Sequence, residues 1–358
     1  MSSMIDMDRQ MKCELHGDMI TAGSDAVSEL YDRGFYGRKK DGVLELSLIE
    51  GAYLLYREKI EIFSNGVSVD FKTFFEIASG RSEDFELRYI VFKDLRERGY
   101  YTKMNPIGFR VYPRGGHPGE VPAHIFIYVI SERAHLPLKS LIHELNKAVN
   151  ARKRLILAIV DEESDITFYE IKKIAMVGKT PIKPGEVEVP MIAGLVNDRT
   201  IVWDQEMSDF LHSSYFFGRK LDESRLQLSL VESGYLLGKR WIRIEHKDIA
   251  DSDAGKFNEY AAGVEPGYML KYQVYAHLRD NGLVAKTGFK FGTHFRVYKQ
   301  FKSDTHSEYL VHAVMPDYIF ALPELSRAVR IANSVRKRMV FGYANGEVEY
   351  VEIGWIRL

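Results

Sequence analysis

The sequence has almost no cysteine and no long apolar run. Cys13 is its only cysteine, which excludes an internal disulfide framework and any zinc site built from several cysteines. The longest apolar stretches, at 124–130 and 155–160, are far shorter than the roughly 20 residues that a helix needs to cross a bilayer. The N-terminal stretch MSSMIDMDRQMKCEL also lacks the apolar segment of a secretory signal. We therefore expect a soluble cytoplasmic protein without a membrane partner.

An excess of positive charge is absent too. Lys and Arg total 49 against 50 Asp and Glu, which gives a formal net charge of −1. This balance excludes a uniformly basic nucleic-acid coat, although a balanced total can contain a local basic patch. The 358 residues are 46% hydrophobic, enough for a sizeable core and, at roughly 150 residues per domain, for two or more domains.

The chain consists of two copies of one unit. The stretch LELSLIEGAYLL at 44–55 recurs as LQLSLVESGYLL at 226–237, and FRVY at 109–112 is repeated letter for letter at 295–298. Three further blocks recur in the same order: 35–39 as 216–220, 88–96 as 271–279, and 152–154 as 336–338. The nearly constant offset excludes chance. The period is much longer than that of solenoid repeats, so each copy is predicted to be a domain-sized unit.

The junction between the copies is predicted within 178–189. Pro181, Pro184 and Pro190, together with Gly185, interrupt any helix there. We place the boundary close to 185. This gives an N-terminal repeat at 1–185 and a C-terminal repeat at 186–358.

Hydrophobic spacing predicts the same order of elements in both repeats. Helices are expected at 47–55 and 229–237, at 85–98 and 268–280, and at 137–150 and 323–333. Gly99 and Gly282 end the second pair, and Pro137 and Pro323 open the third. Strands are expected at 108–112 and 294–298, 123–130 and 309–314, 154–161 and 338–343, and 167–171 and 348–355. Each repeat is therefore α+β (mixed α/β), a small N-terminal α/β subdomain followed by a mixed-sheet subdomain.

Three side chains of the second repeat could carry chemistry. Tyr298 ends a predicted strand, His306 begins the next, and Lys337 separates a helix from another strand. A Tyr, a His and a Lys without a carboxylate suit cleavage of RNA by its own 2′-hydroxyl, which is already held beside the phosphorus. A His transfers protons near neutral pH and a Lys stabilises negative charge, so neither a metal nor a cofactor is required. Taken singly, each residue is more often structural: a packing Tyr, a polar strand His, a solvated Lys at a helix end.

The blocks around these residues closely resemble the archaeal tRNA-splicing endonucleases. The matching stretches are GFKFGTHFRVY at 288–298, THSEYLV at 305–311 and LSRAVRIANSVRK at 325–337. The resemblance implies that Tyr298 is the general base, His306 the general acid and Lys337 the transition-state stabiliser. It also implies cleavage of precursor tRNA at bulge-helix-bulge junctions, with 2′,3′-cyclic phosphate and 5′-hydroxyl ends. It is similar to the homodimeric subclass, in which two repeats are fused.

The same resemblance distinguishes the two repeats. Family enzymes hold a bulge nucleotide between two planar side chains, and Arg330 and Trp355 stand at the matching places. An acidic loop of a structural unit docks on a neighbouring catalytic unit in the family, which implies this role for Asp161, Glu162, Glu163 and Asp165.

The first repeat keeps the three residue types of the second. Tyr112, His124 and Lys153 align with Tyr298, His306 and Lys337, but the Tyr-to-His spacing is 12 in the first repeat and 8 in the second. We expect the first set to be a relic. The alternative function is a non-catalytic RNA-binding or assembly subunit. A Rossmann enzyme is disfavoured because no Gly-x-Gly-x-x-Gly follows a predicted strand.

Overall fold

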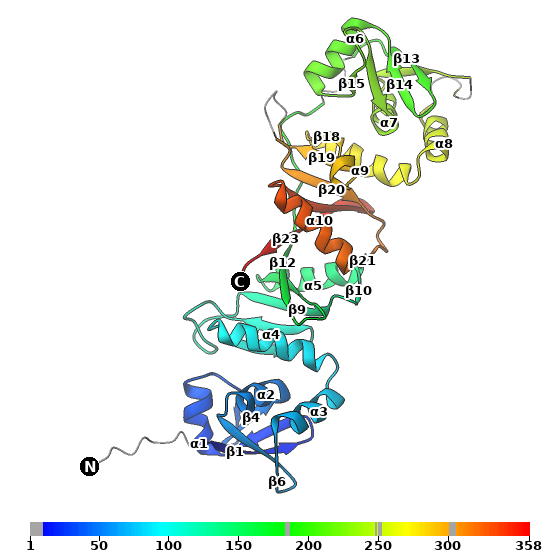
Figure 1. Ribbon diagram of the computed structural model, residues 1–358. Coiled ribbons are helices and arrows are strands. Elements are labelled where there is room, and N and C mark those ends of the chain that lie inside the picture. The colour runs from blue at the N-terminus through cyan, green and yellow to red at the C-terminus, as the bar shows by residue number, and fades with distance from the viewer. Residues whose placement is uncertain (1–9, 183–186, 248, 250–252, 301–305) are drawn as a thin grey trace. The chain divides into compact units, whose positions relative to one another are not determined.

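A computed structural model describes residues 10–182, 187–247, 249, 253–300 and 306–358 (Figure 1). The described residues divide into two units. Unit 1 comprises the residues up to His135 with 143–170 and 356–358, and unit 2 comprises 136–142 and 171–355. The predicted boundary at 185 lies outside the described residues. Among the described residues, no helix is long and apolar enough to span a membrane.

The N-terminal part of unit 1 is a mixed sheet with short helices. Its strands lie in the order β3-β4-β2-β1-β5-β6, and β1 pairs with β5 in parallel. The elements are β1 (Met11–His16), β2 (Met19–Ala22), α1 (Ser24–Ala26), η1 (Val27–Asp32), β3 (Arg38–Lys40), β4 (Val43–Ser47), α2 (Leu48–Tyr56), β5 (Ile60–Ser64), β6 (Val67–Val69) and α3 (Phe71–Arg81).

The next stretch of the chain contains a second mixed sheet, with α4 packed on β9 and β11. Strands β7, β8, β9 and β11 are neighbours in that order, and β9 pairs with β11 in parallel. The elements are α4 (Phe85–Glu97), β7 (Thr102–Asn105), β8 (Gly108–Val111), β9 (Ile125–Ser131), β10 (His135–Pro137), α5 (Leu138–Asn150), β11 (Arg154–Val160) and β12 (Ile166–Lys173).

Unit 2 repeats this plan. Its first sheet has the order β15-β16-β14-β13-β17, and its second has the order β18-β19-β20-β22-β23. The elements of the first part are β13 (Met191–Val196), β14 (Arg199–Val202), α6 (Gln205–Asp209), η2 (Phe210–Ser214), β15 (Arg219–Lys220), β16 (Leu226–Ser229), α7 (Leu230–Gly238), β17 (Ile242–Glu245) and α8 (Ala254–Val264). Those of the second are α9 (Tyr268–Asp280), β18 (Val284–Thr287), η4 (Phe289–Phe291), β19 (Phe295–Tyr298), β20 (Tyr309–Ala313), β21 (Ile319–Ala321), α10 (Leu322–Ser334), β22 (Arg338–Asn345) and β23 (Glu347–Ile356).

Local chemistry explains where the helices begin and end. Ser229 and Glu232 form a capping box at α7, in which each side chain accepts the other residue's backbone N–H. Gly282 follows α9 with a φ of 74°, the left-handed conformation predicted for it. Pro323 lies in the first turn of α10 but does not open it, because the helix begins one residue earlier at Leu322. Pro137 does not open α5: it ends β10, and the helix begins one residue later.

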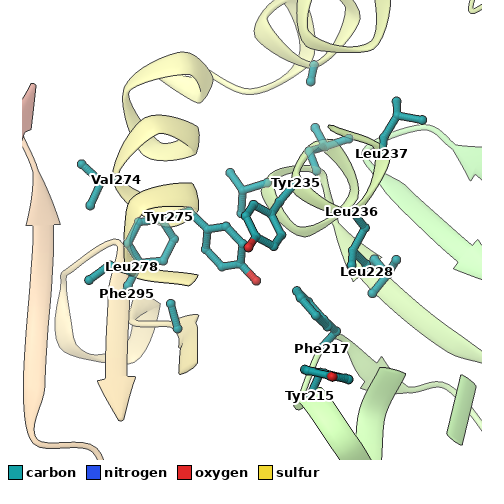
Figure 2. Packing of buried hydrophobic residues seen from close by; sticks show 14 of the residues in the cluster. Tyr215, Phe217, Leu228, Tyr235, Leu236, Leu237, Val274, Tyr275, Leu278 and Phe295 are labelled. Atoms are coloured by element: carbon teal, nitrogen blue, oxygen red, sulfur yellow. The ribbon is translucent and has the colours of Figure 1, made fainter. Parts of the chain in front are cut away.

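Aromatic packing joins the two parts of unit 2 into one core. Figure 2 shows Tyr235 of α7 and Tyr275 of α9 pointing toward each other, with ring centroids 5.9 Å apart in an edge-to-face arrangement. The Arg279 side chain, also from α9, is buried against the Phe217 ring and donates to the Tyr215 carbonyl at 2.8 Å. The sheet that follows α9 is thereby held on a rigid base.

Candidate active site

The predicted catalytic residues lie at one end of the second sheet of unit 2. Tyr298 is the last residue of β19, and Lys337 immediately precedes β22. Strands β20 and β22 run parallel and start together, with Tyr309 paired to Arg338. The sequence predicted that His306 begins β20. In the structure, His306 lies three residues before the first residue of that strand.

Hydrogen bonds tie the three segments together. Lys337 Nζ donates to the Ser307 carbonyl at 2.8 Å, which fixes the residue next to His306. Beyond Tyr298, the Lys299 N–H donates to the Glu308 carboxylate at 3.0 Å. His306 itself is exposed, whereas Tyr298 is buried. An exposed imidazole can meet a substrate while the neighbouring backbone stays in place.

The side chains of β19 point alternately to the two faces of the sheet. Phe295 and Val297 belong to the hydrophobic core that contains Tyr275. Successive side chains of a strand point to opposite faces, so Arg296 and Tyr298 lie on the other face. Tyr298 is buried but is not a member of that core cluster. Its side chain therefore lies on the face of β19 opposite to that cluster.

Positive charge gathers around Lys337. Burial lowers the pKa of Lys337, and the nearby cations of Arg296 and Lys290 lower that pKa further, while Glu308 opposes them. The Nε of Arg296 is buried without a hydrogen-bond partner among the described residues. The positive charges around Lys337 disfavour a further cation and therefore favour the binding of an anion such as a phosphate. No group of three or more potential metal ligands occurs within the described part of the chain.

Sequence reasoning did not single out Arg296, Lys290 or Glu308. The signal for Arg296 was present, because it stands two residues before Tyr298 in a predicted strand and so shares its face. The roles of Lys290 and Glu308 depend on a turn and on a strand pairing, which the sequence does not specify.

The register of the strands corrects the predicted alignment of the two repeats. In unit 2, the Glu308 N–H donates to the Val297 carbonyl at 3.0 Å, and the Glu308 carbonyl accepts from Arg338 at 2.9 Å. Glu308 is thus the residue that links the middle strand to both of its neighbours. His306 lies two residues earlier.

In unit 1 the same two bonds are made by His124. Its N–H donates to the Val111 carbonyl at 3.0 Å, and its carbonyl accepts from Arg154 at 3.0 Å. His124 therefore corresponds to Glu308, and the position of the predicted general acid is occupied by Pro122. The expected match between His124 and His306 is wrong, because the longer loop of the first repeat hid a two-residue shift.

The residues predicted to clamp a base are both exposed. Arg330 lies on α10, and Trp355 lies near the end of β23 with 51% of its surface accessible. Met339 of β22 pairs with Ile353, which stands two residues before Trp355, and Lys337 stands two residues before Met339. Trp355 is therefore not a core aromatic.

The predicted acidic loop is an exposed turn between β11 and β12. Within this turn, the Asp161 carboxylate accepts hydrogen bonds from the backbone N–H groups of Glu163 and Asp165, at 3.0 and 2.9 Å. Glu162 forms an ion pair with Arg133. Glu163 and Asp165 are exposed. Glu162 is exposed as well, so three acidic side chains of the loop are accessible to solvent.

Known proteins match the chain over nearly its full length. The description "tRNA intron endonuclease, catalytic C-terminal domain" matches residues 85–168 and 268–350. The description "tRNA intron endonuclease, N-terminal domain" matches residues 11–75 and 191–254. The predicted tandem duplication and mixed α/β fold are confirmed.

Curated relatives agree with these matches. A tRNA-splicing endonuclease from Methanosarcina acetivorans is 49% identical over 352 residues, which cover 97% of this chain and all of that protein. One from Methanococcoides burtonii is 48% identical over 354 residues with the same coverage. One from Haloferax volcanii is 34% identical, covering 96% of this chain and 98% of that protein. Because both family domains occur twice and the relatives align from end to end, the chain belongs to the tRNA intron endonuclease family.

Proposed function

We propose that the chain cleaves precursor tRNA at bulge-helix-bulge exon–intron junctions, in the cytoplasm, through Tyr298, His306 and Lys337. The observation that carries this proposal is the meeting of three segments at one sheet end, where Lys337 Nζ holds the Ser307 carbonyl beside His306. The family match over 268–350 supports an enzyme and does not favour a non-catalytic binding subunit.

The reaction is a transesterification within the RNA. Tyr298 removes the proton of the 2′-hydroxyl, and the resulting oxygen attacks the adjacent phosphorus. The bond from phosphorus to the 5′-oxygen breaks, and His306 supplies the proton that this leaving oxygen needs. Lys337, with Arg296 nearby, stabilises the extra negative charge on the phosphorane. The products carry a 2′,3′-cyclic phosphate and a 5′-hydroxyl.

Unit 1 acts as the structural partner of this site. Pro122 stands where a general acid would be needed, and a proline side chain cannot donate a proton. Two chains form a homodimer with two working sites. The acidic loop docks on the other chain through its exposed side chains Glu162, Glu163 and Asp165, while Asp161 accepts hydrogen bonds within the loop.

Arg330 and Trp355 hold an unpaired base of the bulge between their planar groups. Both are exposed, and the register of β23 supports a position for Trp355 beside the catalytic lysine. Stacking on an aromatic or guanidinium face tolerates any base, so this clamp would read the bulge rather than its sequence.

The direct test is cleavage of a bulge-helix-bulge RNA in EDTA, with analysis of the ends. We expect cyclic phosphate and 5′-hydroxyl ends, and a loss of roughly 10²–10⁴-fold in the rate for His306→Ala, without loss of RNA binding. His143→Ala is the matched control, because His143 is an exposed histidine of α5. Cleavage by His306→Ala within about threefold of the unsubstituted enzyme would remove His306 from the mechanism.

A further inference from the structure

A short turn beside the active site carries an aromatic ring that the catalytic proposal does not use. Residues 288–294 connect β18 to β19 and contain the 3₁₀ turn η4. In the first repeat, the corresponding strands β7 and β8 are joined by Pro106 and Ile107 alone. The extended turn is therefore a feature of unit 2, the unit with the complete set of catalytic residues.

The turn is built rigidly. Its backbone closes twice, since the Phe291 N–H donates to the Gly288 carbonyl at 2.8 Å and the Gly292 N–H donates to the Phe289 carbonyl at 3.0 Å. A Cβ on Gly288 would meet Thr293 Oγ1 at 2.4 Å, and Gly292 has a φ of 70°. Both glycines are needed for this conformation.

The rigid turn presents Phe289 to solvent. Its exposed fraction is 89%, the highest among the exposed large hydrophobic residues of the described chain. A ring so exposed adds little to folding, because the hydrophobic contribution scales with the apolar area removed from water. Phe291, two residues on, lies toward the catalytic centre instead, with Lys337 Nζ 6.0 Å from its ring centroid.

Cations lie near the turn that carries the exposed ring. Lys290 is exposed, has its Nζ 4.9 Å from the Phe291 centroid, and is close enough to Lys337 to lower its pKa. Arg296 adds a third positive charge near Lys337. An aromatic face within a patch of positive charge is the combination that binds single-stranded nucleic acid.

We propose that the turn Gly288–Gly292 is a second nucleotide-binding subsite, in which Phe289 stacks on an unpaired base next to the cut phosphate and Lys290 contacts the adjoining phosphate. The inference rests on the proposed RNA cleavage and adds a contact to it. Bulges offer unpaired bases that can leave the helix and stack on protein, whereas paired bases cannot.

A second protein chain is the less suitable occupant of this surface. A stable protein interface buries about 800 Å² on each partner, far more than one ring on a tight turn provides. The positive charges of Lys290, Lys337 and Arg296 also favour a polyanion. Association through Phe289 remains one outcome of the test.

The test compares Phe289→Ala, Phe289→Leu and Phe289→Trp in the full-length enzyme. Leu keeps apolar bulk without a π face, and Trp keeps the π face. We expect Ala and Leu to weaken binding of a bulge-helix-bulge RNA by roughly five- to a hundredfold, and Trp to retain it. The melting temperature should stay unchanged, because the ring is exposed. Lys290→Gln should reduce the slope of log affinity against log salt by about 0.7–0.9.

The outcomes separate the subsite from the catalytic proposal. If the unsubstituted enzyme cleaves in EDTA but Phe289→Ala binds RNA equally well, the subsite is wrong and the catalytic proposal stands. If Leu binds as well as Phe, the contact is not stacking. If light scattering shows that Phe289→Ala changes the oligomeric state, the ring contacts protein and not RNA. Ile192→Ala, an exposed apolar change in the first part of unit 2, is the control and should alter neither binding nor assembly.

Discussion

The two lysines that stand at equivalent positions in the repeats should differ sharply in their contribution to cleavage. Lys337 and Lys153 each follow a helix and precede a strand, and their N–H groups make the same bond at 2.8 Å, to Ala332 and to Ala148. Their backbones are therefore held alike. What differs is the surrounding chemistry, because the second repeat has His306 and the first has Pro122.

Lys337→Ala removes two interactions. One is the positive charge that we propose to stabilise the phosphorane, and removing one preorganised donor of this kind costs roughly 10²–10³ in rate, or about 2.7–4 kcal/mol. The other is the 2.8 Å bond to the Ser307 carbonyl. A hydrogen bond from a charged donor contributes about 1.5–3 kcal/mol, and its loss loosens the segment that carries His306. We expect a combined loss of at least about a hundredfold in cleavage.

The assay is single-turnover cleavage of a bulge-helix-bulge RNA with enzyme in excess and EDTA present. Lys337→Met, which keeps the aliphatic stem, should lose as much as Lys337→Ala, because the charge and not the stem is needed. Lys153→Ala should stay within about threefold of the unsubstituted enzyme. Equal losses for Lys337→Ala and Lys153→Ala would mean that both units are catalytic, and the assignment of unit 1 as a structural partner would be refuted.

Three further predictions concern binding, assembly and pH. Trp355→Ala should weaken RNA binding by roughly ten- to a hundredfold without changing the salt slope, and Trp355→Phe should largely restore it; a lower melting temperature with unchanged binding would contradict the clamp. Glu163→Gln combined with Asp165→Asn should weaken the dimer and reduce cleavage with it, as measured by light scattering and by cleavage at matched protein concentrations. An unchanged dimer with full activity would mean that the loop is only a solvated turn without a role in assembly. Burial, with His312 and Lys271 nearby, lowers the pKa of His294 to about 3. As the pH falls, this histidine therefore becomes protonated in the unfolded chain at a higher pH than in the folded protein. Below about pH 6.5, this group should therefore lower the free energy of unfolding by about 1.4 kcal/mol for each unit by which the pH falls. His294→Gln should make the dependence of that free energy on pH, measured by urea denaturation, less steep.

Strong periodicity and clear end signals made some elements predictable. The helix expected at 268–280 is α9, Tyr268–Asp280, because its apolar spacing is regular and Gly282 follows it. The short strands of the N-terminal subdomains were not predicted individually. Strands such as β6 (Val67–Val69) and β15 (Arg219–Lys220) are too short to carry an alternating pattern and exist only through their partners.

The candidate site was predictable in its residue types but not in its surroundings. Tyr298, His306 and Lys337 were identified by resemblance, and Arg296 could have been added from strand alternation. The cationic cluster could not, because Lys290 comes near enough to influence the pKa of Lys337 only through the turn that η4 forms. Nothing in the spacing of these residues along the chain reveals that proximity.

By itself, the sequence determined that the chain is a tandem duplication, because identical blocks in one order need no folding to be recognised. It also determined the family to which both copies belong. Only the tertiary structure decided which residues are equivalent between the repeated blocks, where the loops of the two copies differ in length. His124 corresponds to Glu308 because the hydrogen bonds of parallel and antiparallel neighbours fix both positions at once. When the connecting loops differ in length, spacing along the sequence does not reveal this register. The position of each side chain in the sheet depends on which residue of the neighbouring strand it pairs with.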